Sequence, residues 1–427
     1  MPTTVTTRDL SGIAPGSVPD EYARRGVAQW HDDELVAAAG RVLAPPRAAP
    51  ANSFVLHAPL ELLARAALLP LVAPAAREGA RARIVGLAAG YEAAGDPVDP
   101  PAAIAGRALD ALARDLVAAI GAGDLDTVDA VGARFGALAE PADLQRCLGD
   151  ALAPALAAAG HAPILLNLFP RVDLARVTTR AVLRGPAREI ARNSDWRIRW
   201  HESAELGADG PPLLDALLAV PQLGLPGSDF IFPVMHQVES AGVPDALFSG
   251  VVNGPIDVVA ARRTVARVAA WSMLQEPDQY APYGWTHCLT MPQAVMGIAG
   301  AGVEPRTAVA VAATFVAGFR AALGTVALDP AWQPEPFAAG TLTDALADGP
   351  DTAAAMVWHA PDDALASITT ELVSRAALHH DAHLVKYTLA CLHAAQDDSD
   401  ARRLFLAAAA SLSAFWARLP DDDFFAD

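Results

Sequence analysis

Lysine is almost absent from this sequence of 427 residues. Among its 31 lysine and arginine residues, Lys386 is the one lysine. Acidic residues outnumber basic ones, so the formal net charge is -18. Binding of nucleic acid depends on clusters of basic side chains that neutralise phosphates. The sequence contains no such cluster, and we expect no nucleic-acid partner.

Cysteine is scarce, and a secretory signal is not evident. Cys147, Cys288 and Cys391 are odd in number, widely spaced and free of any C-x-x-C pair. This pattern argues against a disulfide framework and against a zinc knuckle. Residues 1–8 lack the basic start and apolar stretch of a secretory signal. We therefore expect a cytoplasmic protein.

Apolar runs long enough to cross a bilayer are missing as well. The longest runs span residues 307–319 and 404–416, and they are closed by Arg320 and Arg418. A transmembrane helix needs roughly 18 to 20 apolar residues. We expect both runs to be core helices, and we expect no association with a membrane.

Several catalytic signatures are also absent. The sequence has neither a G-x-G-x-x-G motif after a strand nor a G-x-x-x-x-G-K-[ST] motif, which argues against Rossmann and P-loop enzymes. It lacks the G-x-S-x-G nucleophile elbow and the H-E-x-x-H zinc motif. Serine-hydrolase and zinc-protease chemistry therefore have no support.

Apolar residues at helical spacing are what the sequence has in abundance. Hydrophobic residues make up 53% and charged residues 19% of the chain, which is enough apolar material for a large folded core. Alternating strand patterns are scarce, so we predict a mainly α protein with a single large multi-helix domain. The predicted helical segments are 59–74, 102–121, 142–159, 257–275, 305–323, 362–395 and 401–418.

Two regions depart from this helical pattern. Residues 1–50 are rich in proline, threonine and charge, and we predict an N-terminal extension there, followed by a helical domain over 51–427. Residues 194–251 carry tryptophan, phenylalanine and proline among glycines, which predicts an irregular, aromatic-lined segment. Such a segment could form a lid or a pocket wall, or it could simply connect two helical halves.

Lys386 stands out because the composition otherwise uses arginine wherever a positive charge is needed. Arginine cannot lose its proton in a protein, whereas a desolvated lysine can become a neutral nucleophile, a Schiff base or a carbamate. This contrast indicates that an amine is required at position 386. The alternative is the chance survival of a solvated lysine.

Lys386 shares a predicted helical face with His383. The members of this face follow one another at spacings of three and four, and its upstream half is apolar, which predicts burial. A buried ammonium without a partner costs several kcal/mol or loses its proton. The predicted face consists of Leu365, Ile368, Leu372, Ala376, His379, His383, Lys386, Ala390 and His393.

The spacing of His383 and Lys386, three residues apart, suits two ligands of one metal ion. An ammonium cannot be a ligand, but a neutral amine that captures carbon dioxide becomes a carboxylated lysine with an anionic oxygen donor. The alternative is a core histidine held by a hydrogen bond, beside a lysine paired with an acid elsewhere in the chain.

Three further histidines, His57, His161 and His287, lie in apolar surroundings near predicted helix starts and are candidate ligands. The first two stand in His-Ala-Pro, where the proline can occupy the first turn of a helix. His287 follows Tyr283 and Trp285, which we predict as pocket walls. Each histidine could instead serve as a core or capping residue. We expect structural roles for His31, His201, His236 and His393, and we keep His379 and His380 as alternative ligands or as partners of the ligands.

Taken in chain order, four neighbourhoods resemble the questin oxidase-like family of helical oxygenases. The closest match is Asp381-Ala-His383-Leu-Val-Lys386, similar to the family's D-A-H-x-x-K helix. His287-Cys-Leu-Thr290, similar to H-x-x-T, comes next, followed by the helices around His57 and His161. Members of the family are associated with oxidative opening of anthraquinone-type polyketide rings.

The resemblance implies an Fe(II) ion held by four histidines and a carboxylated lysine. One position of an octahedral site would remain for dioxygen or substrate. The chain departs from the family pattern in the Ala-Pro after the first two histidines and in the additional His379-His380 pair. The implied ligands are His57, His161, His287, His383 and Lys386.

We therefore expect an oxidoreductase of secondary metabolism. It would be an oxygenase that oxidises a hydrophobic aromatic or polyketide-like molecule. We expect no catalytic residue beyond the metal ligands. One alternative is a Baeyer-Villiger-type monooxygenase that depends on NADPH, which could also be an external reductant. Another is a hydrolase with two metals bridged by a carboxylated lysine, which calls for H-x-H on a strand. The last is a non-catalytic helical binding protein with core histidines. The sequence does not determine the oligomeric state.

Overall fold

The fold is known from a computed structural model, and helices dominate it, as predicted. Within the part of the chain that the structure describes, β structure is limited to three isolated bridges between single residues. The described residues are 8–48, 53–99, 101–102, 104–172, 183–203, 212–227, 231–253, 255–336 and 340–419.

The N-terminal third consists of helices that begin well before residue 51. Asp32 to Glu34 supply negative charge to the first turn of one of them, where it complements the helix dipole. The elements are η1 (Pro15–Ser17), α1 (Val18–Arg24), η2 (Val27–Gln29), α2 (Asp32–Leu43), α3 (Ser53–Leu68), η3 (Leu69–Leu71), η4 (Pro74–Ala76), α4 (Arg77–Ala93), α5 (Leu109–Ala122), α6 (Leu125–Leu138) and α7 (Pro141–Leu152).

The central part of the chain contains mostly short helices. Pro212, Pro233 and Pro244 stand at or near the start of helices, where a proline costs no hydrogen bond within the helix. The elements are η5 (Ala158–Gly160), α8 (Ala162–Leu168), η6 (Phe169–Arg171), α10 (Arg184–Arg192), α11 (Trp200–Ser203), α12 (Leu213–Leu218), α13 (Ile231–Ser240) and α14 (Val243–Asn253).

The C-terminal part contains the two longest of the described helices, with 18 and 19 residues. Its elements are α15 (Val258–Gln275), η7 (Asp278–Tyr280), η8 (Ala281–Trp285), α16 (Thr286–Gly297), α17 (Pro305–Leu323), α18 (Leu342–Asp348), α19 (Pro350–Trp358), η9 (Asp362–Ala364), α20 (Leu365–Leu378), α21 (Ala382–Asp397), η10 (Ser399–Ala401) and α22 (Arg402–Ala417).

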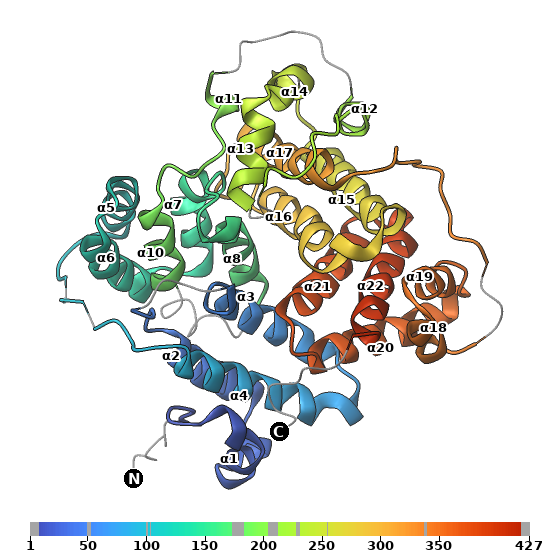
Figure 1. The fold of residues 1–427 in the computed structure, drawn as a ribbon. Helices are drawn as coiled ribbons and strands as arrows, with labels where there is room; N and C mark the ends of the chain where they lie inside the picture. The colour runs from blue at the N-terminus through green and yellow to red at the C-terminus, as the bar shows by residue number, and fades with distance from the viewer. Residues whose placement is uncertain are drawn as a thin grey trace.

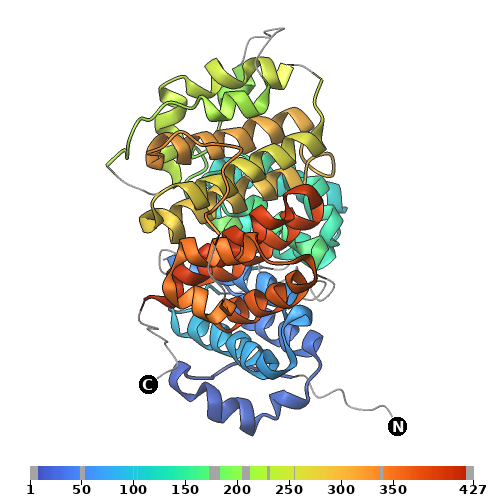
Figure 2. The ribbon, with the colours of Figure 1, turned by 90° about the vertical axis from the view of Figure 1, so that its right-hand side faces the viewer.

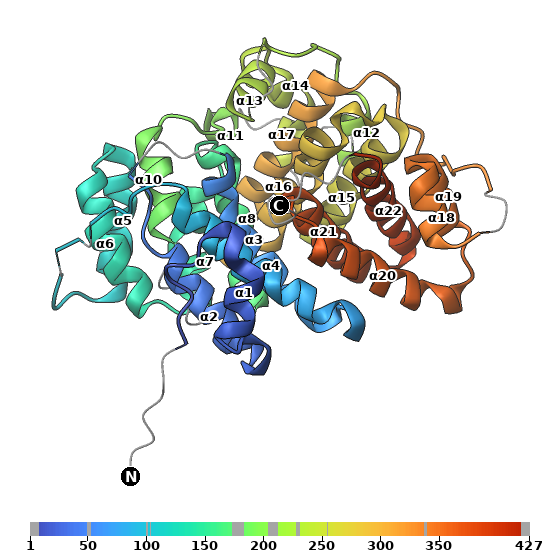
Figure 3. The same ribbon diagram turned by 60° about the horizontal axis from the view of Figure 1, so that its bottom comes forward.

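The helices pack into one body around a continuous apolar cluster that extends from Leu10 to Ala414. α5, α6 and α10 gather on one side and α18 and α19 on the opposite side (Figure 1). In the view turned by 90°, α1, α2 and α4 form one end, α13 and α14 form the other, and α20 to α22 lie between them (Figure 2). Seen with the bottom of the molecule turned toward the viewer, the helices α3, α8, α16 and α21 lie near the centre of the molecule (Figure 3).

Two sequence predictions need correction here. The helical body was expected to begin at residue 51, but α2 packs against α3 and α4, and its side chains Leu35 and Val36 are fully buried. The run Asp32–Leu43 is an amphipathic helix with one buried apolar face, and only the prolines that follow it favour an extended chain. The described parts of 194–251 are not irregular, because α11 to α14 occupy most of them.

In contrast to the expectation from the sequence, two helical windows are long and apolar enough to cross a membrane by length and composition alone. They are Phe54–Leu71, of which 67% is buried inside the protein, and Pro305–Leu323, of which 89% is buried. Core helices of soluble proteins pass the same test.

Leu35→Ala tests whether α2 belongs to the main folding unit. We expect a loss of about 2–5 kcal/mol in the free energy of unfolding, because the substitution leaves a cavity in a fully buried position. Chemical denaturation followed by circular dichroism would measure it. Arg41→Ala, at an exposed position of the same helix, is the control. If residues 8–48 folded separately, the main transition would keep its midpoint in Leu35→Ala.

Candidate metal centre

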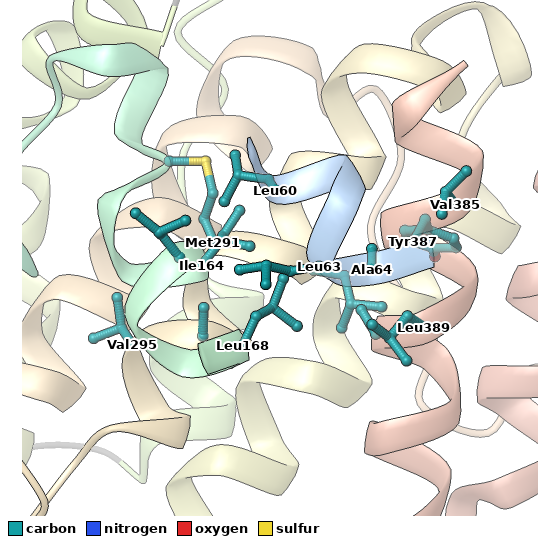
Figure 4. Packing of buried hydrophobic residues seen from close by; sticks show 14 of the residues in the cluster. Leu60, Leu63, Ala64, Ile164, Leu168, Met291, Val295, Val385, Tyr387 and Leu389 are labelled. Atoms are coloured by element: carbon teal, nitrogen blue, oxygen red, sulfur yellow. The ribbon is translucent and has the colours of Figure 1, made fainter. Parts of the chain in front are cut away.

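The candidate ligands come from four helices that form a closed ring of contacts. α3 contacts α21, α21 contacts α16, α16 contacts α8, and α8 contacts α3. Apolar side chains from all four helices pack against one another beside the site, among them Leu63, Ile164, Met291 and Leu389 (Figure 4). The polar side chains that enter this region are therefore held in a dry environment.

All five sequence-predicted ligands lie together in this region. The ring centroid of His57 lies 4.4 Å from that of His161 and 4.5 Å from that of His383. The ring centroids of His287 and His383 are 5.0 Å apart. Ligand atoms of His57, His287 and His383 all lie within 4.8 Å of one another. None of the five residues, including Lys386, is more than 6% exposed. Residues separated by more than 300 positions in sequence thus form one buried cluster.

His57 lies in the second turn of α3, because that helix begins at Ser53. The prediction that Pro59 occupies the first turn is therefore wrong. Pro59 stands inside the helix, where it cannot donate the hydrogen bond that would otherwise reach the carbonyl of Val55. An interior proline costs a helix about 3 kcal/mol, a cost that the packing of α3 against its neighbours must offset.

His161 follows a strained piece of backbone. Ala158 and Ala159 have φ values of 51° and 52°, and Gly160 follows with 66°, so three consecutive residues adopt left-handed conformations. For a non-glycine residue this conformation costs about 1–2 kcal/mol, and such strain collects at functional sites. α8 then begins directly after His161 with Pro163 in its first turn, as predicted.

His287 is positioned by a π-helical turn, Ala281–Trp285, immediately before α16. Its Nδ1–H donates to the backbone carbonyl of Tyr283. Because a carbonyl oxygen can only accept, the proton of the neutral ring is on Nδ1 and the lone pair is on Nε2. That Nε2 lies 3.3 Å from Nε2 of His161. Isolated π-helical turns are frequent at functional sites.

His383 stands at the start of α21, and the long helical face predicted across this region is interrupted. α20 ends at Leu378, and Asp381 caps α21 by accepting from the backbone N–H of His383 at 2.6 Å. The same carboxylate oxygen accepts from His383 Nδ1 at 2.9 Å, which leaves the Nε2 lone pair for a metal ion. His379 therefore belongs to the turn, where its Nδ1 accepts from the Asp381 N–H at 3.0 Å.

A buried brace links this turn to the helix of His57. Arg65 of α3 donates to the carbonyls of Ala377 and His379 at 2.7 and 2.6 Å, which satisfies the last turn of α20. It also donates to Glu61 at 2.7 Å. Burial raises the pKa of Glu61, and Arg65 opposes that shift. Sequence reasoning missed this pair, although a Glu and an Arg four residues apart in an otherwise apolar helix are a signal for it.

Lys386 is 4% exposed, and its Nζ has no hydrogen-bond partner among the described residues. Burial lowers the pKa of this amine from 10.5 to about 7, although the carboxylates of Asp381 and Glu61 oppose the shift. A cavity of about 20 Å³ is lined by Lys386 together with Asn167 and Gln293. It has room for about one water molecule. The amine is therefore substantially neutral near neutral pH.

Burial also disfavours a positive charge on three of the four histidines of the cluster. Burial lowers the pKa of His161 and His287 well below 6.5 and also lowers that of His383, and Lys386 adds to each shift. Burial alone would raise the pKa of Asp381, but the hydrogen bonds and charge of His383 lower it to about 2. Neutral imidazoles with fixed Nδ1 protons are the form of histidine that binds metal ions.

The donor set fits a metal ion. Metal–nitrogen bonds of about 2.0–2.1 Å place neighbouring ligand atoms of one ion about 3 Å apart, close to the 3.3 Å between the Nε2 atoms of His161 and His287. In the metal-free protein, a proton on His161 Nε2 can donate to the lone pair of His287 Nε2, and a bound metal ion would take the place of that proton. His57, His287 and His383 form a group that could hold a metal ion.

The two predicted pocket residues occupy different environments. Tyr283 is 55% exposed, and its ring lies edge-on to His383 with 4.8 Å between centroids. Trp285 is fully buried, with the guanidinium of Arg320 5.9 Å from the centre of its ring. Neither residue lines the cavity beside Lys386, so their role as pocket walls stays a prediction. His379 and His380 stack on each other beside Trp416.

Comparison of the chain with models of protein families, with curated proteins and with solved structures gave no match.

Asp381→Asn tests the carboxylate that orients His383. We expect metal affinity to fall about 10- to 100-fold, because loss of a carboxylate partner leaves a histidine ligand less basic and less well oriented. Competition with a chromogenic chelator would measure the affinity. Asp257→Asn is the matched control, since Asp257 caps α15 in the same way but holds no histidine. Equal affinities in the two variants would contradict this role for Asp381.

The buried amine makes the stability of the metal-free protein depend on pH. Between about pH 7 and 10.5 the unfolded chain carries a proton on Lys386 that the folded chain does not bind. Unfolding then takes up a proton, so stability falls as the pH is lowered from about 10.5 to about 7 and this loss ends below about 7. The slope is at most about 1.4 kcal/mol per pH unit.

Comparison with Lys386→Met isolates this contribution from that of the other groups. We expect the variant to exceed the metal-free wild type in free energy of unfolding at neutral pH, and the difference to shrink as the pH approaches 10.5. Urea denaturation at a series of pH values would measure it. A difference independent of pH would mean that the amine is solvated in the folded protein.

Proposed function

We propose that this chain is a non-haem iron-dependent oxygenase related to the questin oxidase-like family. In this proposal Fe(II) is held by His57, His161, His287, His383 and a carboxylated Lys386. The observation that carries it is the convergence of four buried imidazoles from four helices on one buried amine that lacks a hydrogen-bond partner among the described residues. Neither burial nor packing explains why such groups would be collected at one point.

The number and kind of donors favour iron over zinc. Structural zinc sites are tetrahedral, whereas five protein donors suit an octahedral ion with one open position. Imidazole is a good ligand for Fe(II), and an anionic oxygen donor offsets part of the charge of the ion. When bound, the iron would supply activation of dioxygen, a chemistry that side chains lack.

Carboxylation of Lys386 accounts for the lone amine. The neutral Nζ attacks the carbon of carbon dioxide, an N–C bond forms, and one amine proton leaves to water. The product is a carbamate with one negative charge on its oxygens. Burial favours this reaction because it lowers the pKa of Lys386 to about 7, so that much of the amine is already unprotonated.

The remaining residues of the site hold protons and exclude water. The carbonyl of Tyr283 and the carboxylate of Asp381 keep the Nδ1 protons of His287 and His383 in place. The apolar side chains between the four helices keep the surroundings dry, which strengthens each electrostatic contact. The strained backbone at Ala158 and Ala159 fixes the position of His161.

The substrate that we propose is a hydrophobic aromatic or polyketide-like small molecule that is oxidised by dioxygen, with ring cleavage as one outcome. NADPH would act as an external reductant if a single oxygen atom enters the product. We place this reaction in the cytoplasm, with neither nucleic acid nor membrane as a partner.

Replacement of the lysine tests the proposal. We expect the wild type to contain iron when purified under reducing conditions, and Lys386→Ala and Lys386→Arg to lose at least about 10-fold in iron affinity, because neither side chain can form a carbamate. Elemental analysis measures the metal, and oxygen uptake with a panel of hydroxylated anthraquinones measures activity. His359→Ala is the control, since His359 bonds the carbonyl of Pro334 outside the site.

Labelled bicarbonate gives a separate readout of carboxylation. Wild type should show a carbamate signal in carbon NMR that both lysine variants lack. A protein without metal, or lysine variants with unchanged metal content and activity, would overturn the proposal.

A further inference from the structure

Tyr283 is the one exposed residue in an otherwise buried stretch that leads into the candidate metal centre. Every other residue of 281–296 is buried, whereas 55% of Tyr283 is exposed. Single exposed aromatic residues are common on protein surfaces. This one differs because its ring lies edge-on to His383, with 4.8 Å between the two ring centroids, and His383 is only 6% exposed. The ring of Tyr283 thus reaches from solvent to a candidate metal ligand.

The chain around His383 lies close to the surface. His383 is the second residue of α21, and the three residues before that helix, His379 to Asp381, are all partly exposed. By contrast, the residues on either side of His161 and of His287 are buried. Solvent therefore comes near the cluster of histidines on the side of His383, where the Tyr283 ring lies.

The backbone of Tyr283 is fixed in three ways. Pro282 before it has a φ angle that its own ring restricts. Gly284 after it packs against Leu323 so closely that a Cβ atom would have no room. The carbonyl of Tyr283 itself accepts the Nδ1–H of His287. A shift of this backbone would disturb His287, so any motion at Tyr283 must be confined to its side chain.

The side chain of Tyr283 is much less restrained. Its hydroxyl forms no hydrogen bond within the part of the chain that the structure describes. Its ring has aromatic neighbours in His383 and in Trp416, whose centroid lies 6.3 Å away. Exposed side chains change rotamer within nanoseconds. Rotation about the Cα–Cβ bond would move the ring into solvent while the carbonyl stays on His287.

We propose that the ring of Tyr283 is the gate of the candidate metal centre. With the ring against His383, the route from solvent to this histidine is closed. With the ring rotated outward, small solutes reach the cluster. That these solutes are the metal ion and dioxygen rests on the proposed function. The gate itself depends on neither, because it consists of contacts within the chain.

Acylation of histidines by diethyl pyrocarbonate would test the gate on the full chain after treatment with a chelator. The reagent acylates a neutral ring nitrogen, and the lone pair of His383 is on Nε2 because its Nδ1 bonds Asp381. We expect Tyr283→Ala to raise the rate at His383 about 10-fold, since the closed ring limits access to it most of the time. Peptide mass spectrometry measures the rate at each histidine.

Tyr283→Phe should react like the wild type, because the ring covers His383 and the hydroxyl takes no part. Tyr280→Ala is the matched control, since it removes a partly buried tyrosine ring from the adjoining turn and keeps the Cβ that lies near Gly284. His236 is exposed and gives the reference rate in every sample. Equal rates at His383 in Tyr283→Ala and the wild type, or an equal rise in Tyr280→Ala, would overturn the proposal.

Release of Co²⁺ to excess EDTA gives a second readout. Tyr283→Ala should release the ion about 10-fold faster than the wild type and Tyr283→Phe, while its equilibrium affinity changes less than about 3-fold, because an open gate speeds entry and exit alike. A loss of affinity as large as the gain in release rate would overturn the gate, since Tyr283 would then only support the ligands. A chain that binds no metal would overturn the proposed function alone, because acylation of His383 still decides the gate.

Discussion

The constraint on which the site depends is the burial of an amine among four imidazoles. Lys386 has no hydrogen-bond partner within the described structure, and burial lowers its pKa to about 7. Desolvation disfavours charge on the amine and on His161, His287 and His383 alike, which favours their neutral, metal-binding forms. A metal ion can bind several such neutral nitrogens at once, whereas apolar side chains cannot.

The backbone near these groups adopts conformations that lower its local stability. Two consecutive alanines adopt left-handed conformations before His161, and prolines stand inside both α3 and α16. Each of these features destabilises the local backbone. The long-range brace of Arg65, which joins α3 to the last turn of α20, works in the opposite direction. Strain beside a site and reinforcement around it are the expected combination where geometry matters more than local stability.

Features that depend on neighbouring residues could be predicted from the sequence, whereas features that depend on long-range contacts could not. The spacing of His383 and Lys386 on one helix was predicted correctly, because a turn of helix follows from residues three and four positions apart. The continuous face from Leu365 to His393 was not, because Asp381 caps a new helix and Arg65, more than 300 residues earlier, satisfies the carbonyls of the old one. The helices of residues 8–48 were not predicted, because the prolines near them favoured an extended chain.

The sequence by itself determined the fold class, the helical character of most segments and the chemical identity of the one lysine. These properties follow from apolar periodicity and composition, which act over a few residues. Only the tertiary structure decided that His57, His161, His287 and His383 share one buried point with Lys386. Those relations depend on how four helices pack, and packing is set by contacts between residues far apart in the chain.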